Sequence, residues 1–228
     1  MHYCGVVSMQ DTLQLAMLEE VRASEPPIGL SAIFFEPGSA SQVADELRSL
    51  GEVVVAVGAP LSGRSRELER RGVPPLRESP EAGRLVELLD LPVFAPGDDH
   101  DAHGPVPEGA YHEYAVFETH PDGVFYALQG GRLPAKRHPF GMQMRIDELL
   151  DDRVTDESGD LWHRRIEEID AAACALSAHR YAVGHAFWLA DSDDGVLVLP
   201  GTGLPQGSAR QGVVPPVERL QLPPERDG

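Results

Sequence analysis

The chain has 228 residues, of which 42% are apolar and 25% charged, a composition typical of a folded globular protein rather than a disordered or fibrous one. Its formal net charge of −18 disfavours sequence-independent binding to nucleic acid, because such binding needs Lys and Arg side chains that neutralise phosphates. No run approaches the roughly 20 apolar residues that span a bilayer, and no secretory signal precedes the first strand. We therefore expect a cytoplasmic protein without membrane contact.

The first part of the chain predicts three antiparallel strands, a helix and a buried strand. Residues 3–9 and 13–18 have the pattern of two strands joined by a turn, and 30–36 of a third. Residues 41–50 carry apolar side chains at the spacing of an amphipathic helix. The β-branched run at 52–60 is typical of a strand buried on both faces. The helix is therefore expected to cross over between parallel strands.

The middle of the chain predicts a loop or insertion and then a short strand. Residues 61–110 include one helical stretch around 80–90, and residues 96–109 are too polar and too rich in Pro and Gly for regular structure. Residues 114–121 are expected to form a strand that ends at a proline, and 122–130 a short helix.

The last part predicts the longest helix, at 161–183, and a hairpin formed by 185–190 and 195–200. We expect one domain at 1–203 and a disordered tail at 204–228, which is rich in Pro, Gln and Arg. The long helix has one expected core-facing stripe, formed by Trp162, Ile166, Ile169, Ala173 and Leu176.

Four segments carry a resemblance to a known family. They are CGVVSM at 4–9, VVVAVGAPLSGR at 53–64, VFETHPDGVFYALQGGRLPAKR at 116–137 and IEEIDAAACALSAHRYAVG at 166–184. In this order they resemble the family known as domain of unknown function 429, whose members are predicted nucleases. The resemblance implies an α/β fold with an RNase H-like mixed sheet, in which an antiparallel meander and parallel strands are flanked by helices.

The resemblance also implies a chemistry. Hydrolysis of a phosphodiester by two divalent ions needs several carboxylates that converge on metals about 4 Å apart. Carboxylate oxygens suit Mg²⁺ or Mn²⁺. The implied activity is therefore that of a metal-dependent nuclease, with Mg²⁺ or Mn²⁺ as cofactor and nucleic acid as partner.

The acidic site that the resemblance implies is incomplete in this sequence. Glu118 matches the family's strand glutamate and Asp170 its helix aspartate, so these two are the expected metal ligands, and Glu167 is a third candidate catalytic acid. Val7 and Gly58 stand where two strands are expected to supply aspartates. Neither side chain binds a metal.

Two basic residues are candidates for substrate binding, and each has a plainer alternative. Lys136 follows a Gly-Gly turn and is placed to pair with a phosphate or a carboxylate, or to be a surface charge. Arg64 follows the strand after the crossover, where ligands bind in α/β folds, but its neighbours also fit an exposed helix. Glu118, Asp170 and Glu167 have the same alternative, a solvated face.

Other motifs add little. Asp98–His103 contains possible metal ligands, although a polar loop explains it as well. The sequence GAPLSGRS lacks the ending of a phosphate loop, and Ser62 lacks the frame of a nucleophile elbow. Cys4 and Cys174 lack CxxC spacing, which favours reduced, buried thiols over a disulfide or a zinc site.

Two functional hypotheses follow. The first is a metal-dependent phosphodiesterase that keeps Glu118 and Asp170 as ligands. The second is a catalytically degenerate member of the family, in which the scaffold serves as a binding or regulatory module. The second is motivated by Val7, Gly58 and the acidic composition.

Overall fold

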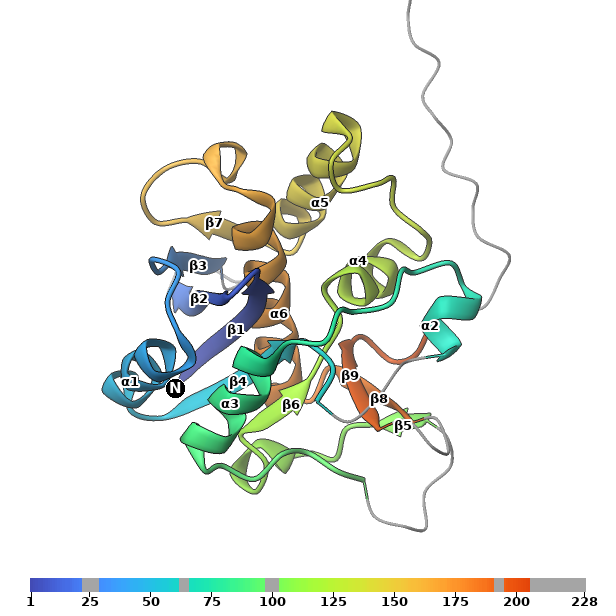
Figure 1. Ribbon diagram of the computed structural model, residues 1–228. Helices are drawn as coiled ribbons and strands as arrows, with labels where there is room; N and C mark the ends of the chain where they lie inside the picture. Colours follow the sequence, from blue (N-terminus) through green and yellow to red (C-terminus); the bar gives the residue numbers. More distant parts are fainter. Residues whose placement is uncertain (22–28, 62–65, 97–102, 191–194, 206–228) are drawn as a thin grey trace, which may run out of the picture.

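The nine strands of the described residues form one mixed sheet (Figure 1). The computed structural model describes residues 1–21, 29–61, 66–96, 103–190 and 195–205. The order across the sheet is β5-β8-β9-β6-β4-β1-β2-β3-β7. The strands are β1 (His2–Met9), β2 (Thr12–Val21), β3 (Gly29–Phe34), β4 (Val53–Gly58), β5 (His103–Pro105), β6 (Val116–Glu118), β7 (Val154–Asp156), β8 (Ala186–Ala190) and β9 (Val196–Pro200).

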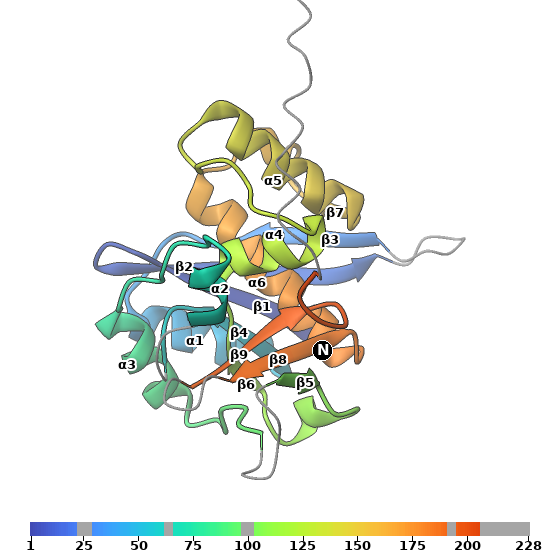
Figure 2. The same cartoon turned by 90° about the vertical axis from the view of Figure 1, so that its right-hand side faces the viewer.

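The centre of the sheet has the expected topology. Strands β1, β2 and β3 form an antiparallel meander, and β4 and then β6 join β1 in parallel. A meander extended by parallel strands beside its first strand is the RNase H-like arrangement, so the predicted fold class is confirmed. Figure 2 shows β5, β8 and β9 at the end of the sheet away from α5 and β7.

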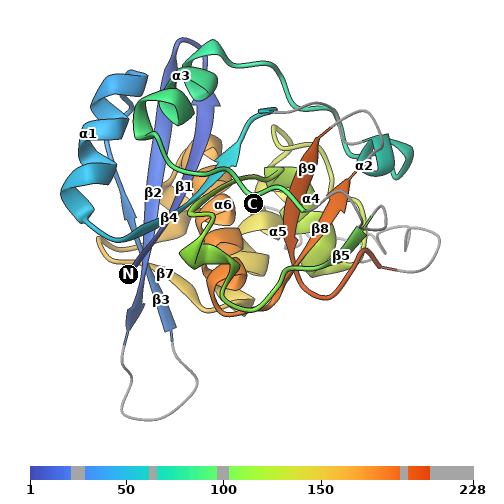
Figure 3. The same ribbon diagram turned by 90° about the horizontal axis from the view of Figure 1, so that it is seen from below.

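Helices cover both faces of the sheet. Figure 3 shows α1 and α3 on one side of β1, β2 and β4, and α6 on the other. Helices α4 and α5 pack beside α6. The helices are α1 (Ala40–Leu50), α2 (Arg66–Arg70), α3 (Pro80–Leu89), α4 (Pro121–Gln129), α5 (Pro139–Asp151) and α6 (Ile166–Ala182).

Helix α6 is the central buried helix, and it differs from the expected one. It begins at Ile166, and its side chains are buried on all sides from Glu168 to His179 rather than along one stripe. Trp162, expected in that stripe, lies in a separate 3₁₀ turn and is 45% exposed. The helix lies close to β1, because a Cβ atom on Gly5 would come within 2.1 Å of the Ala171 carbonyl oxygen.

Several short elements were not expected from the sequence. The stretch 96–109, expected to be irregular, contains β5, which pairs with β8. Helix α5 and strand β7 were not predicted, and β6 is much shorter than the strand expected at 114–121. The proposed metal loop lies outside the described residues except for His103, as does the tail from residue 206. Among the described residues, no helix is long and apolar enough to span a membrane.

Candidate functional site

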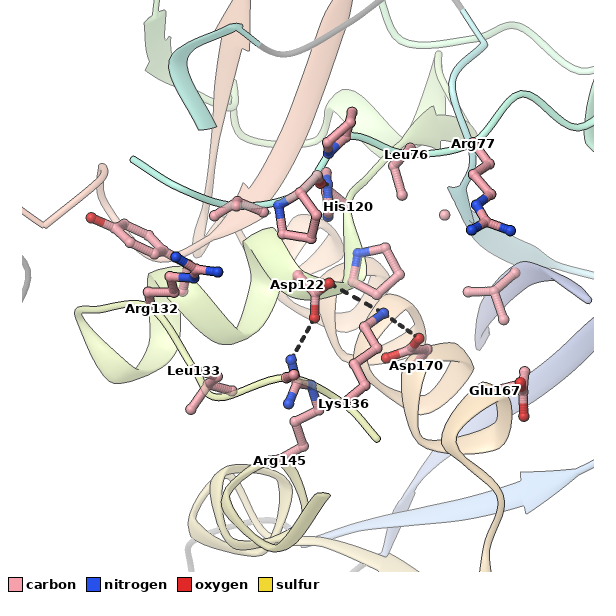
Figure 4. A pocket seen from close by; sticks show the side chains of 18 of the residues that line it. Leu76, Arg77, His120, Asp122, Arg132, Leu133, Lys136, Arg145, Glu167 and Asp170 are labelled. Carbon is pink, nitrogen blue, oxygen red and sulfur yellow. Dashed lines mark hydrogen bonds and ion pairs between the residues drawn. The ribbon is translucent and has the colours of Figure 1, made fainter. Parts of the chain in front are cut away.

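A cavity of about 560 Å³ opens at the carboxyl ends of β1 and β4, the edge at which α/β folds commonly bind ligands. Its walls come from these two strands, from α4, α5 and α6, and from the segments around residues 73–77 and 132–136. The lining residues with polar or charged side chains are Ser8, Arg77, His120, Asp122, Tyr126, Arg132, Lys136, Arg145, Glu167 and Asp170 (Figure 4).

Four charged side chains form a network in the floor of this cavity (Figure 4). The Lys136 Nζ lies 2.6 Å from Oδ2 of Asp170 and 3.3 Å from Oδ2 of Asp122. The other oxygen of Asp122 accepts a hydrogen bond of 2.7 Å from Nη2 of Arg145. Arg145 also donates to two backbone carbonyl oxygens. A single ammonium group therefore bridges carboxylates from α4 and α6.

The pKa values reflect competition between burial and these ion pairs. Burial raises the pKa of Asp170 to about 6, although Lys136 opposes the shift. Burial alone would lower the pKa of Lys136, but Asp170 and Asp122 outweigh it, so the pKa is raised and the side chain is charged. For Asp122, burial is outweighed by Lys136 and Arg145, and the pKa is lowered.

Two buried polar atoms of the network have no hydrogen-bond partner among the described residues. They are Oδ1 of Asp170 and Nε of Arg145. Asp170 is 8% exposed and Arg145 3% exposed. A buried polar atom without a partner costs free energy, so the network is under-satisfied on its own.

His120 places Asp122 at the cavity. It caps the start of α4, where its Nδ1 accepts a hydrogen bond of 3.2 Å from the Gly123 amide. Its Nε2 lies 2.9 Å from the carbonyl oxygen of Pro74, a donor position for that ring nitrogen. Burial lowers the pKa of His120 to about 4, so the ring is neutral at pH 7. Asp122 then lies in the first turn of α4, where the helix dipole stabilises an anion.

Glu118 lies on the other face of the sheet. Phe117 packs in the cluster that includes α6, and adjacent residues of a strand point to opposite faces. Glu118 pairs in register with Val57, which packs beneath α1 and α3. Its Oε2 accepts a hydrogen bond of 2.8 Å from the Leu61 amide. The structure therefore does not bring Glu118 and Asp170 into one site.

Val7 and Gly58, in contrast, face the cavity beside Asp170. A Cβ atom on Gly58 would lie 2.8 Å from Cγ1 of Val7 and 2.9 Å from Sγ of Cys174. Both distances are shorter than real Cβ contacts, so an acidic side chain at Gly58 would need its neighbours to move. Cys4 and Cys174 are free and buried, as expected from their spacing.

The family model described as "Protein of unknown function (DUF429)" matches residues 100–194. The match covers less than half of the chain. The resemblance found in the sequence is confirmed there, and the segment contains Asp122, Lys136, Arg145, Glu167 and Asp170.

No curated protein matches the sequence. Among solved structures, the chain is similar to one described as "Thermus thermophilus RuvC structure", with a TM-score of 0.41 and 16% identity over 77% of this chain and 91% of that one.

The other residues singled out in the sequence have different placements. Glu167 lines the cavity near Asp170 and is half-buried, within the DUF429 segment. Arg64 lies outside the described residues. Sequence reasoning missed Asp122 and Arg145. A signal for Asp122 was available, because an acid directly after His-Pro suits the first turn of a helix.

The cavity does not fit the divalent ions that the resemblance implies. In the described part of the chain, no three His, Cys, Asp or Glu side chains are arranged to hold a metal ion. The two carboxylates of the DUF429 segment that face each other, Asp122 and Asp170, already share the Lys136 ammonium. Val7 and Gly58 supply no further side-chain oxygen.

Proposed function

We propose that this chain is a catalytically degenerate protein of RNase H-like fold, whose cavity serves as a binding site rather than a metal-dependent nuclease centre. The observation that carries the proposal is the place of Lys136, whose ammonium lies between the carboxylates of Asp122 and Asp170.

A tethered cation competes with a free one. Because Lys136 is part of the chain, its local concentration at the two carboxylates is far above that of a dissolved metal ion. A divalent ion would have to displace it and leave a half-buried ammonium without its partners. Two-metal hydrolysis also needs more carboxylates than this cavity presents.

The test is direct. We expect calorimetry with Mn²⁺ or Mg²⁺ to show no tight binding of two ions, and we expect no cleavage of DNA, RNA or branched substrates. Asp170→Asn is the control that distinguishes cleavage by this cavity from cleavage by a contaminating nuclease. Mn²⁺-dependent cleavage that disappears in Asp170→Asn would refute the proposal.

The second candidate is a metal-dependent phosphodiesterase acting on nucleic acid, with Mg²⁺ or Mn²⁺ and with Glu118, Asp170 and Glu167 as its acids. It is favoured by the unpartnered Oδ1 of Asp170 and by Glu167 in the same cavity. Glu118→Gln separates the two candidates. Loss of a metal-dependent cleavage in both Glu118→Gln and Asp170→Asn would support the phosphodiesterase.

A further inference from the structure

Two arginines of the cavity are available to a ligand. Arg77 and Arg132 line the cavity, are exposed, and make no ion pair with another described residue. Figure 4 shows them on opposite sides of the row formed by Asp122, Lys136 and Asp170. A guanidinium group offers a planar set of donors that matches phosphate and carboxylate oxygens.

The charge balance of the cavity differs from that of the chain. Four basic and three acidic side chains line it, whereas the whole chain carries −18. Lys136 and Arg145 are already paired with Asp122 and Asp170. The charged groups left for a ligand are Arg77, Arg132 and the half-buried Glu167. This balance favours an anionic ligand.

The size and the walls of the cavity favour a small organic molecule. A volume of about 560 Å³ lies within the range of roughly 300–1,000 Å³ that is typical of small-molecule sites. Between the charged groups the lining is apolar and rich in proline. The prolines of this lining are Pro74, Pro75, Pro121 and Pro134.

We propose that the cavity binds a small organic bisphosphate, with one phosphate on Arg77, the other on Arg132, and the organic part against the proline-rich wall. This inference rests on the proposed binding role of the cavity. Lys136 stays paired with Asp122 and Asp170 and does not bind the ligand. Because Arg77 and Arg132 lie on opposite sides of the charged row in Figure 4, one anionic group on each arginine suits the site better than a single group shared by both.

The probe is a nucleoside 3′,5′-bisphosphate, titrated by calorimetry into the full chain in the presence of EDTA. We expect Arg77→Gln and Arg132→Gln each to weaken binding about tenfold, a typical loss for a charge-assisted hydrogen bond. Their effects should multiply in the double variant, because the two groups share no partner. Arg84→Gln, an exposed arginine of α3 outside the cavity, is the matched control.

A nucleoside monophosphate sharpens the test. It should bind about tenfold more weakly, and one of the two arginine substitutions should then have no further effect. The inference is overturned by the absence of bisphosphate binding at millimolar concentration, by equal losses in Arg84→Gln, or by a single-stranded oligonucleotide that binds more tightly than the bisphosphate. None of these outcomes would support the nuclease hypothesis, which the cleavage assay with Mn²⁺ tests separately.

Discussion

At the level of one residue, Lys136 is expected to contribute to the stability of the fold. Its ammonium pairs with two carboxylates that are mostly removed from water. Lys136→Met keeps the length of the side chain and removes the charge. We expect the free energy of unfolding to fall by about 2 to 3 kcal/mol, because an uncompensated buried carboxylate is costly. Urea unfolding at pH 7 measures it.

The control for this substitution is the next residue. Arg137 is exposed and does not line the cavity. We expect Arg137→Met to change the free energy of unfolding by less than about 0.5 kcal/mol, as is usual for surface sites. Equal losses in the two variants would show that Lys136 acts only as a surface charge.

Asp170 predicts a specific dependence of stability on pH. Burial raises its pKa from 3.8 to about 6 in the folded chain, so the folded state binds a proton between about pH 6 and pH 4 that the unfolded state does not. Stability from this group is therefore present below the unfolded pKa and is lost as the pH rises through about 6. The full effect is on the order of 3 kcal/mol.

Asp170→Asn isolates this effect, because asparagine does not titrate. The free energy of unfolding of the native chain, minus that of Asp170→Asn, should increase as the pH falls from 6.5 to 4. Other carboxylates titrate in both proteins and cancel in the difference. A difference that stays constant, or that decreases towards pH 4, would mean that the pKa of Asp170 is not raised.

The sequence predicted part of this site. Three of the residues proposed from the sequence line the cavity: Lys136, Glu167 and Asp170. They could be proposed because the long helix and the Gly-Gly turn that carry them have recognisable sequence patterns. The sequence did not indicate that Glu118 lies on the face of the sheet opposite the cavity. A strand of three residues is too short for an alternation of apolar and polar residues to be recognised. Arg145 was missed for a different reason, because the helix that carries it was not predicted.

At the level of elements, the contact of β1 with α6 depends on small residues. A Cβ atom on Gly5 would lie 2.1 Å from the Ala171 carbonyl oxygen and 2.2 Å from the Ala175 amide nitrogen. These are backbone atoms in the middle of a buried helix and cannot move aside singly. We expect Gly5→Ala to lower the free energy of unfolding by at least about 3 kcal/mol, the upper range for overpacking.

Gly83 provides the opposite case on another helix. It lies within α3, and a Cβ atom there would meet nothing within 4 Å. We expect Gly83→Ala to raise the free energy of unfolding by about 0.5 to 1 kcal/mol, because alanine is the better helix former. Thermal unfolding of both variants compares them. Similar effects of the two substitutions would argue against the close approach of α6 to β1.

Elements with a clear period were the ones that the sequence predicted. The meander and the crossover helix carry long apolar patterns, and both are confirmed. Helix α6 was predicted, but its full burial was not, because only one apolar stripe was assigned to the core and the small residues outside that stripe were not. Strands β5 and β7 have three residues each, too few to show an alternation of apolar and polar side chains. They are held by pairing with β8 and β3, which are distant in the sequence.

For the whole molecule, the order of the elements determined the topology. The crossover through α1 leaves β4 parallel to β1, and the adjacent meander then fixes the order of the first four strands. The positions of β8 and β9 beyond β6 were not predicted, because a hairpin at the end of a chain can join either edge of a sheet.

The charge of the whole molecule leads to a prediction about nucleic acid. With a net charge of −18, the chain should be repelled by a phosphate backbone, because binding depends on the release of counterions by Lys and Arg. We expect no change in the anisotropy of a labelled 30-mer DNA duplex at about 10 µM protein and 50 mM salt. Repulsion of this kind acts far less on a small bisphosphate, whose charges lie within reach of two arginines. Binding of the duplex that weakens steeply with salt would show instead that basic side chains outside the cavity form a phosphate-binding surface.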